Sequence, residues 1–313
     1  EIKAETQNTV LVADGSIAVW ADDNQSLYVV AGAANMAISL TGSIGAAAGV
    51  AVVKASNQVS ALVGAKAILT AYGKIGDGIY FYTGTLNGSD GTKKRSRIMT
   101  NQKGILIGAF NNNNLTAITA SGSASVGAAA AAASTTVVSR TKVQAKVNSG
   151  AQLNQRNKES VTSASKVKVI AMDSTEVDTA AGGAQVSIAG AAGTIVVTYL
   201  TKTVEAVLQG TIYAPGGIEV LAVSDNNVFL ASVSGSAALA GGAGSASVLY
   251  TSNTVSGSLG GTVQSGTGAV TVSAVSRQYI FNSAATITGG GAAAGGGVVS
   301  IIFKSTTTAR VLP

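Results

Sequence analysis

The most constraining feature of this sequence is a short pattern that recurs along its whole length. An aliphatic pair and an alanine in the form I-x-V-x-A, with another apolar residue six positions after the Ala, occurs five times in 313 residues. The first copy is SIAVWADDNQSLYVVAG (16–32), and successive anchor alanines are 88, 62, 51 and 52 residues apart, at Ala21, Ala109, Ala171, Ala222 and Ala274. Regular spacing of this kind is typical of repeat architectures, so the sequence predicts a repeating unit of about 51 residues.

A second pattern keeps the same register. A strand-like V-x-A-x-V/L segment recurs, and its central residues Ala206, Gly257 and Ala309 each lie 35 positions after an anchor alanine. Apolar residues alternate with polar or small ones throughout, which is typical of strands and not of helices. The sequence therefore predicts an all-β fold, a right-handed parallel β-solenoid in which each unit of about 51 residues forms two coils and advances the axis by about 10 Å.

The segment VGAAAAAASTTVVS (126–139) contains six consecutive alanines, and alanine is the best helix former. Its counterparts in the other units, such as IAGAAGTIVV (188–197), carry Gly in the same places, and each Gly would cost about 1 kcal/mol in a helix interior. We therefore expect an extended segment whose small residues allow close approach of neighbouring backbone. If it is buried, Ala130→Leu should destabilise the fold by overpacking.

The domain organisation predicted from these repeats is a single solenoid over residues 1–313, a fragment of a longer protein, with two insertions. Residues 72–103 form a loop insertion in the first unit, and residues 154–165 form a shorter one in the second. Both fall between the V-x-A-x-V strand and the next anchor strand, so we expect them to leave at one corner and project from the same side. The trio Tyr80, Phe81 and Tyr82 is expected to pack the first insertion onto its scaffold.

The inventory of reactive side chains argues against catalysis. The chain has no His and no Cys, which excludes imidazole bases, thiol nucleophiles and the usual zinc ligands. The densest acidic groups are Asp22 with Asp23, and Asp173 with Glu176 and Asp178. Because short polar residues recur at this point of nearly every unit, we expect them to bond a turning backbone. The sequence predicts no enzyme, no metal site and no cofactor, since a polysaccharide-degrading solenoid would need a carboxylate cluster present in one unit only.

Positive charge is concentrated in a few segments of this chain of net charge +6. TKKRSRIMTNQK (92–103), RTKVQAK (140–146) and the region around residue 156 carry most of it. A basic run of this kind is either a solvated loop or a contact for an anionic surface. The expected contact residues, in one patch formed by the two insertions, are Lys93, Lys94, Arg95, Arg97, Lys103, Arg156 and Lys158. Sequence-specific nucleic-acid binding is disfavoured because no aromatic residues interleave with them, and no segment is apolar enough for a transmembrane span.

The succession VNSGAQL (147–153), followed by VKVIAMDSTEVDTAAGGAQVSIAGAAGTIVVTYLTKTVEAVLQG (167–210), resembles the repeat region of the fusobacterial leukotoxin and filamentous-haemagglutinin-like family of large exoproteins. The resemblance extends over nearly the whole chain. It implies an internal segment of a secreted or surface-exposed bacterial virulence protein with a structural and adhesive role, whose partner is the host cell surface, including its anionic glycans or lipids. The alternative that it implies is a leukocyte-directed cytotoxin that forms pores or damages membranes.

Overall fold

The computed structural model describes the backbone of residues 1–38, 42–87 and 96–313, and the side chains of these residues outside 84–97. The described chain is almost entirely β-strand, with one short 3-10 helix, η1 (Lys158–Ser160). The short strands are β1 (Ile2–Thr6), β2 (Val10–Ala13), β5 (Ile68–Ala71), β6 (Ile79–Asn87), β7 (Ser96–Gln102), β10 (Gln152–Leu153), β12 (Thr211–Ala214) and β14 (Thr262–Ser265). The long strands are β3 (Ile17–Ala37), β4 (Ile44–Val63), β8 (Gly104–Ser125), β9 (Ala128–Val147), β11 (Lys166–Leu208), β13 (Ile218–Leu259), β15 (Val270–Gly289) and β16 (Ala292–Val311).

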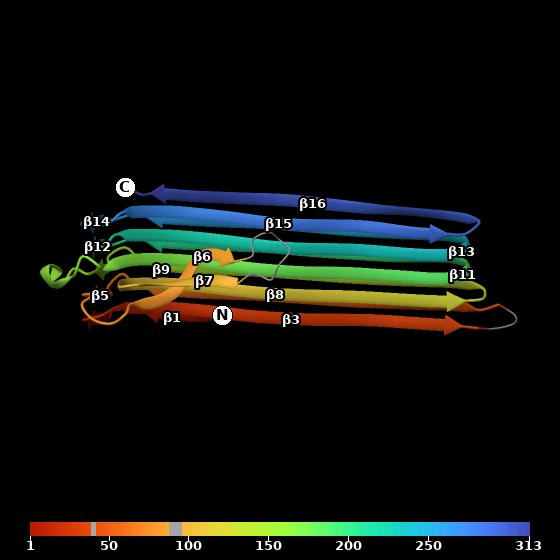
Figure 1. Ribbon diagram of the computed structural model, residues 1–313, viewed down its shortest axis with the longest axis horizontal. Coiled ribbons are helices and arrows are strands. Elements are labelled where there is room, and N and C mark those ends of the chain that lie inside the picture. The colour runs from red at the N-terminus through yellow and green to blue at the C-terminus, as the bar shows by residue number, and fades with distance from the viewer. Residues whose placement is uncertain (39–41, 88–95) are drawn as a thin grey trace.

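Long strands are arranged as flattened rungs that stack in parallel (Figure 1). In each rung an outgoing strand runs to a distal turn, and a return strand runs back to the proximal end. The outgoing strands are β3, β8, the first half of β11, the first half of β13, and β15; the return strands are β4, β9, the second halves of β11 and β13, and β16. At the proximal end β2, β5, β10, β12 and β14 form a short third sheet.

The register of the rungs confirms the predicted solenoid and corrects its coil length. Ala21, Ala109, Ala171, Ala222 and Ala274 are direct partners from rung to rung. Residue 171 therefore pairs with residue 222, one whole unit away, and not with a residue about 25 positions away. The prediction of two coils per unit is wrong: one unit is one coil, and it advances the axis by about 4.8 Å. The strands of each unit are fewer and much longer than the short strands that the sequence predicted.

Inward-facing side chains fill the space between the outgoing and return sheets in two apolar cores separated by a polar layer, and small polar residues such as Ser121 and Ser234 are buried nearer the distal turns. A proximal apolar core includes Ile107, Val143 and Val169 from several rungs. A distal apolar core includes Leu115, Val137 and Leu200. A layer of buried polar side chains lies between them, so the interior is not uniformly apolar.

The alanine-rich segment confirms the expectation of an extended conformation. Residues 128–139 belong to β9, and their side chains alternate between the inside and the outside of the solenoid. Ala131 is 3% exposed, whereas Ala130 faces outward. The small inward residues let the two sheets approach closely: a Cβ added to Gly49 on β4 would lie 2.8 Å from the carbonyl oxygen of Ala120 on β8.

This alternation makes a testable prediction about neighbouring alanines. Ala131→Leu should lower the free energy of unfolding by about 1–3 kcal/mol, because the larger side chain overpacks the space between the sheets. Ala130→Leu should change it by less than about 0.5 kcal/mol, because that side chain enters solvent. Urea denaturation of the two variants measures the difference. Equal effects at both positions would contradict the strand orientation.

The two predicted insertions lie outside the rung register. Residues 72–103 contain the antiparallel hairpin β6–β7, and residues 154–165 contain η1. Their roots are in contact, since Asn157 donates to the hydroxyl of Tyr72 at 3.1 Å and Thr162 donates its backbone N–H to the carbonyl of Tyr72 at 2.9 Å. From this shared corner the hairpin extends along the solenoid, whereas η1 lies at the proximal end (Figure 1).

Aromatic side chains pack the hairpin onto the outer surface of the outgoing strands. Phe81 is 2% exposed and belongs to a cluster with Phe110 and Met172. Tyr82 contacts Phe110 edge to face at a centroid distance of 5.1 Å, and Trp20 stacks on the same ring at 4.3 Å. Tyr80 is exposed. Two of the three aromatic residues, Phe81 and Tyr82, thus pack as expected, and Tyr80 does not.

Candidate functional site

The acidic groups lie inside strands, and the expectation that they occupy a turn is wrong. Asp22 and Asp23 are in β3, and Asp173, Glu176 and Asp178 are in β11. Each outgoing strand continues well beyond the I-x-V-x-A pattern, so the recurring polar position two residues after the anchor alanine faces inward. Asp173 is fully buried there.

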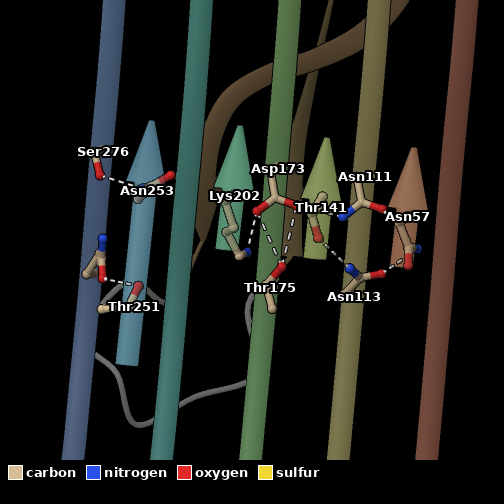
Figure 2. A network of polar contacts seen from close by, with 11 residues as sticks. Asn57, Asn111, Asn113, Thr141, Asp173, Thr175, Lys202, Thr251, Asn253 and Ser276 are labelled. Carbon is tan, nitrogen blue, oxygen red and sulfur yellow. Dashed lines mark hydrogen bonds and ion pairs between the residues drawn. The ribbon is translucent and has the colours of Figure 1, made fainter. Parts of the chain in front are cut away.

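Figure 2 shows the buried polar layer to which Asp173 belongs. The Nζ of Lys202 forms an ion pair with Oδ2 of Asp173, and Asn111 donates its amide to Oδ1 at 2.6 Å. Thr175 donates its hydroxyl to the same carboxylate at 3.3 Å. The layer continues into the other rungs, where Asn113 donates to Thr141 at 3.3 Å, Asn57 donates to Asn113 at 3.0 Å, and Asn253 donates to Ser276 at 2.8 Å.

The burial of this layer indicates that it stabilises the fold and does not bind a substrate. The side chains of Asp173 and Lys202 are both 0% exposed, so no dissolved substrate reaches them. Burial lowers the pKa of Lys202 because removal from water disfavours the ammonium, although the charge of Asp173 opposes this shift. Within the described residues, no group of three or more acidic side chains is placed to hold a metal ion.

The structure places only some of the expected basic contact residues. Lys93, Lys94 and Arg95 lie outside the described residues, and Arg97 belongs to β7, although its side chain is also outside them. Lys103 is half-buried after β7, and Arg156 is exposed. Lys158 donates to Gln264 at 3.1 Å and lies 5.6 Å from the ring centre of Tyr213. The patch that was expected to merge both insertions therefore stays a prediction.

A different set of basic residues is brought together on the outer surface of the return strands, which we call the basic return face. These residues alternate with inward-facing core residues, as Arg140 and Lys142 do around buried Thr141. Glu205 is the one acidic residue of these five return strands, and its carboxylate accepts a hydrogen bond from Gln144 at 2.7 Å. Strand β1 continues the same sheet beyond β4, and there Lys3 and Glu5 form an ion pair with no net charge. The basic return face consists of Lys54, Arg140, Lys142, Lys146, Lys304 and Arg310.

The outer surface of the outgoing strands has the opposite balance. Its outward charges include an ion pair between Lys168 and Glu219 at 2.9 Å and another between Arg277 and Asp225 at 3.6 Å. Five outward positions on these strands are acidic and three are basic, and the acidic ones are Asp22, Glu176, Asp178, Glu219 and Asp225. Two of these eight side chains, Lys168 and Asp225, are buried. The strands of the rungs therefore separate charge between the two sheets, and the β6–β7 hairpin adds the basic residue Arg97 on the outgoing side.

Sequence reasoning identified Arg140, Lys142 and Lys146 as part of a basic segment but missed Lys54, Lys304 and Arg310. These three are isolated along the chain, and only the rung register brings them near the segment: the position of Arg140 corresponds to Ser56 in β4 and to Lys304 in β16. Alignment of the return strands by their V-x-A-x-V pattern would have found this grouping.

Comparison of the chain with models of protein families, with curated proteins and with solved structures gives no significant match. No helix in the described part of the chain has the length and apolar character needed to cross a membrane. Interpretation of function therefore depends on the geometry and charge of the solenoid itself.

Proposed function

We propose that this chain is a non-catalytic, adhesive segment of a secreted or surface-exposed bacterial exoprotein, and that the basic return face contacts an anionic surface of the host cell. The observation that supports the proposal is the separation of charge. Six outward basic residues and one acidic residue lie on the five long return strands, and the Lys3–Glu5 ion pair on β1 adds no net charge, whereas acidic residues predominate on the outgoing strands. A rigid face of one sign attracts polyanions over several ångströms and orients the molecule on them.

The geometry of the face suits an extended polyanion. Alternate strand residues such as Arg140 and Lys142 are about 7 Å apart, and neighbouring rungs are about 4.8 Å apart. Backbone hydrogen bonds hold both spacings. Sulfated glycans and anionic phospholipid surfaces share the required chemistry, namely repeated negative charges that several basic residues can meet at once.

Heparin affinity measured at several salt concentrations tests this proposal. The triple variant Arg140→Ser, Lys142→Ser and Lys146→Ser should weaken binding by about 3- to 150-fold, since each exposed charge contributes about 0.2–1 kcal/mol. Wild-type binding should weaken as salt shortens the Debye length from about 10 Å at 0.1 M.

A second triple variant, Lys103→Ser, Arg156→Ser and Lys158→Ser, removes the same charge from the two insertions and serves as the matched control. It should retain most of the heparin affinity. If it loses as much as the return-face variant, net charge governs binding; if it alone loses affinity, the insertions are the contact surface. Either result contradicts the proposed role of the return face.

The rival proposal from the family resemblance is cytotoxicity toward leukocytes. An adhesive segment should bind leukocytes without releasing a cytosolic dye, whereas a membrane-damaging segment should release it at low dose. This assay distinguishes the two roles with the chain as it exists. A polysaccharide-degrading role has less support, since the fully buried carboxylate Asp173 has no access to a polymer.

A further inference from the structure

The part of the solenoid nearest the distal turns contains no charged residue. The uncharged stretches of the five rungs each include a distal turn, and they are residues 24–53, 104–139, 179–201, 226–276 and 278–303. On the first return strand, Lys54 follows Ile44 by ten residues, which corresponds to about 33 Å of extended chain. On the third outgoing strand Asp178 precedes Ile188 by the same ten residues, so the charges of the solenoid are far from the distal turns.

Large apolar side chains are exposed where these rungs turn. Ile44 is 82% exposed, Ile38 is 77% exposed and Leu239 is 68% exposed, although side chains of this kind are usually buried. Every rung contributes at least one of them. The row, which we call the distal apolar edge, consists of Ile38, Ile44, Val126, Ile188, Leu239 and Ile287, each at least half exposed.

The dimensions of this edge do not suit a second copy of the chain. Five rungs at about 4.8 Å and two sheets about 10 Å apart give a footprint of about 240 Å². A stable protein interface buries about 800 Å² on each partner. The exposed apolar residues lie on both broad faces and on the turns of the edge. A second copy stacked on one broad face would therefore leave the turn residues and the opposite face in water.

A lipid bilayer meets these conditions better than a protein partner. Its surface needs no shape complementarity and covers both faces and the turns of an edge at the same time. The absence of charge removes the main cost of entering the bilayer. On the return strands the first outward residues behind the edge are Ala and Gly, for example Ala130 and Gly244, which offer little apolar surface for deeper insertion, and exposed Val50 and Ile195 lie further back. The side chains should therefore enter only the outer 5–10 Å or so of the bilayer.

We propose that the distal apolar edge is a membrane-binding edge that inserts its Ile, Val and Leu side chains into the surface of a phospholipid bilayer. This contact is separate from the proposed polyanion contact of the basic return face, since it uses other residues and does not require charge. Binding to uncharged phosphatidylcholine vesicles should consequently persist at high salt.

Vesicle flotation with the whole chain and phosphatidylcholine vesicles tests the proposal. The variant Ile44→Ser, Ile188→Ser and Leu239→Ser should weaken binding by about tenfold or more, because it removes half of the inserting side chains. The variant Val10→Ser, Val12→Ser and Ile75→Ser removes three apolar residues, each about half exposed or more, from the proximal end and should bind as the wild type does. Circular dichroism establishes that both variants keep the β fold.

A fluorescence measurement locates the contact independently of affinity. Trp20 is the single tryptophan of the chain and lies far from the edge, against Phe110. In the variant Trp20→Phe with Ile188→Trp, the tryptophan emission should shift to the blue when vesicles are added. Lipids brominated near the headgroup should quench this fluorescence. Tyr80→Trp on the exposed side of the hairpin should show neither effect.

The alternatives give different results. No binding to phosphatidylcholine, or equal binding by the edge variant, would overturn the proposal. Binding that requires anionic lipid, disappears at high salt and is lost in the return-face triple variant would assign the contact to the basic return face. A dimer detected by light scattering without lipid and abolished by the edge variant would show that a second copy covers the edge.

Discussion

Replacing Lys202 by Met should lower the free energy of unfolding by about 3–5 kcal/mol, the largest effect expected of any exposed or buried basic residue in this chain. The substitution leaves the carboxylate of Asp173 buried without its ion-pair partner, and the remaining donors, Asn111 and Thr175, do not neutralise its charge. Both charged side chains are fully buried, so water cannot compensate. Urea denaturation followed by circular dichroism measures the loss.

The sequence of the next rung suggests a double variant that tests whether the unpaired buried charge causes the loss of stability. Ser224 and Asn253 occupy there the positions of Asp173 and Lys202. The double variant Asp173→Ser with Lys202→Asn copies that pair and should recover most of the lost stability, because no isolated charge remains buried. Lys54→Met, on the outer surface, should change the stability by less than about 0.5 kcal/mol. A double variant as unstable as Lys202→Met would show that the charge imbalance is not the cause.

Gly104→Ala should lower the free energy of unfolding by about 2–4 kcal/mol. Gly104 begins β8 with φ of +112°, a conformation that residues with a side chain rarely adopt. An added Cβ would lie 2.1 Å from the carbonyl oxygen of Lys166 in the next rung. The backbone would have to shift at the corner where rungs 2 and 3 stack.

Gly122→Ala is the matched control for this prediction, since it is in the same strand. No atom lies within 4 Å of the position of its added Cβ, so the change should be nearly neutral or slightly stabilising. Thermal unfolding followed by circular dichroism compares both variants with the wild type. Equal melting temperatures for the two would contradict the close approach at the corner.

The repeat spacing predicted the stacking partners of the rungs but not the shape of one coil. Every anchor alanine pairs with the next, so the register read from the sequence is confirmed. The predicted length of the coil was wrong because two short coils and one long flat coil have the same alternation of apolar and small residues. Close contacts between the two sheets, such as that between Gly49 and Ala120, allow the long flat coil.

The polar and charged residues show a similar division. The recurrence of Asp, Asn and Ser two residues after each anchor alanine indicated a structural role. It did not show that Lys202, 29 residues after Asp173, lies on the facing strand and pairs with it. The six residues of the basic return face and the six of the distal apolar edge are likewise scattered in sequence, and only the rung register gathers them.

The sequence by itself determined the all-β class, the parallel direction of stacking and the pairing of equivalent residues. These features depend on the local alternation of apolar and polar residues and on a repeat that is visible in the sequence. Tertiary structure alone decided which residues face one another across the interior, how charge divides between the two broad faces, and which apolar residues stay exposed at the distal turns. The physical reason is that one 51-residue coil places residues of opposite sheets in contact at sequence separations that vary continuously along the rung. No single spacing in the sequence encodes such contacts.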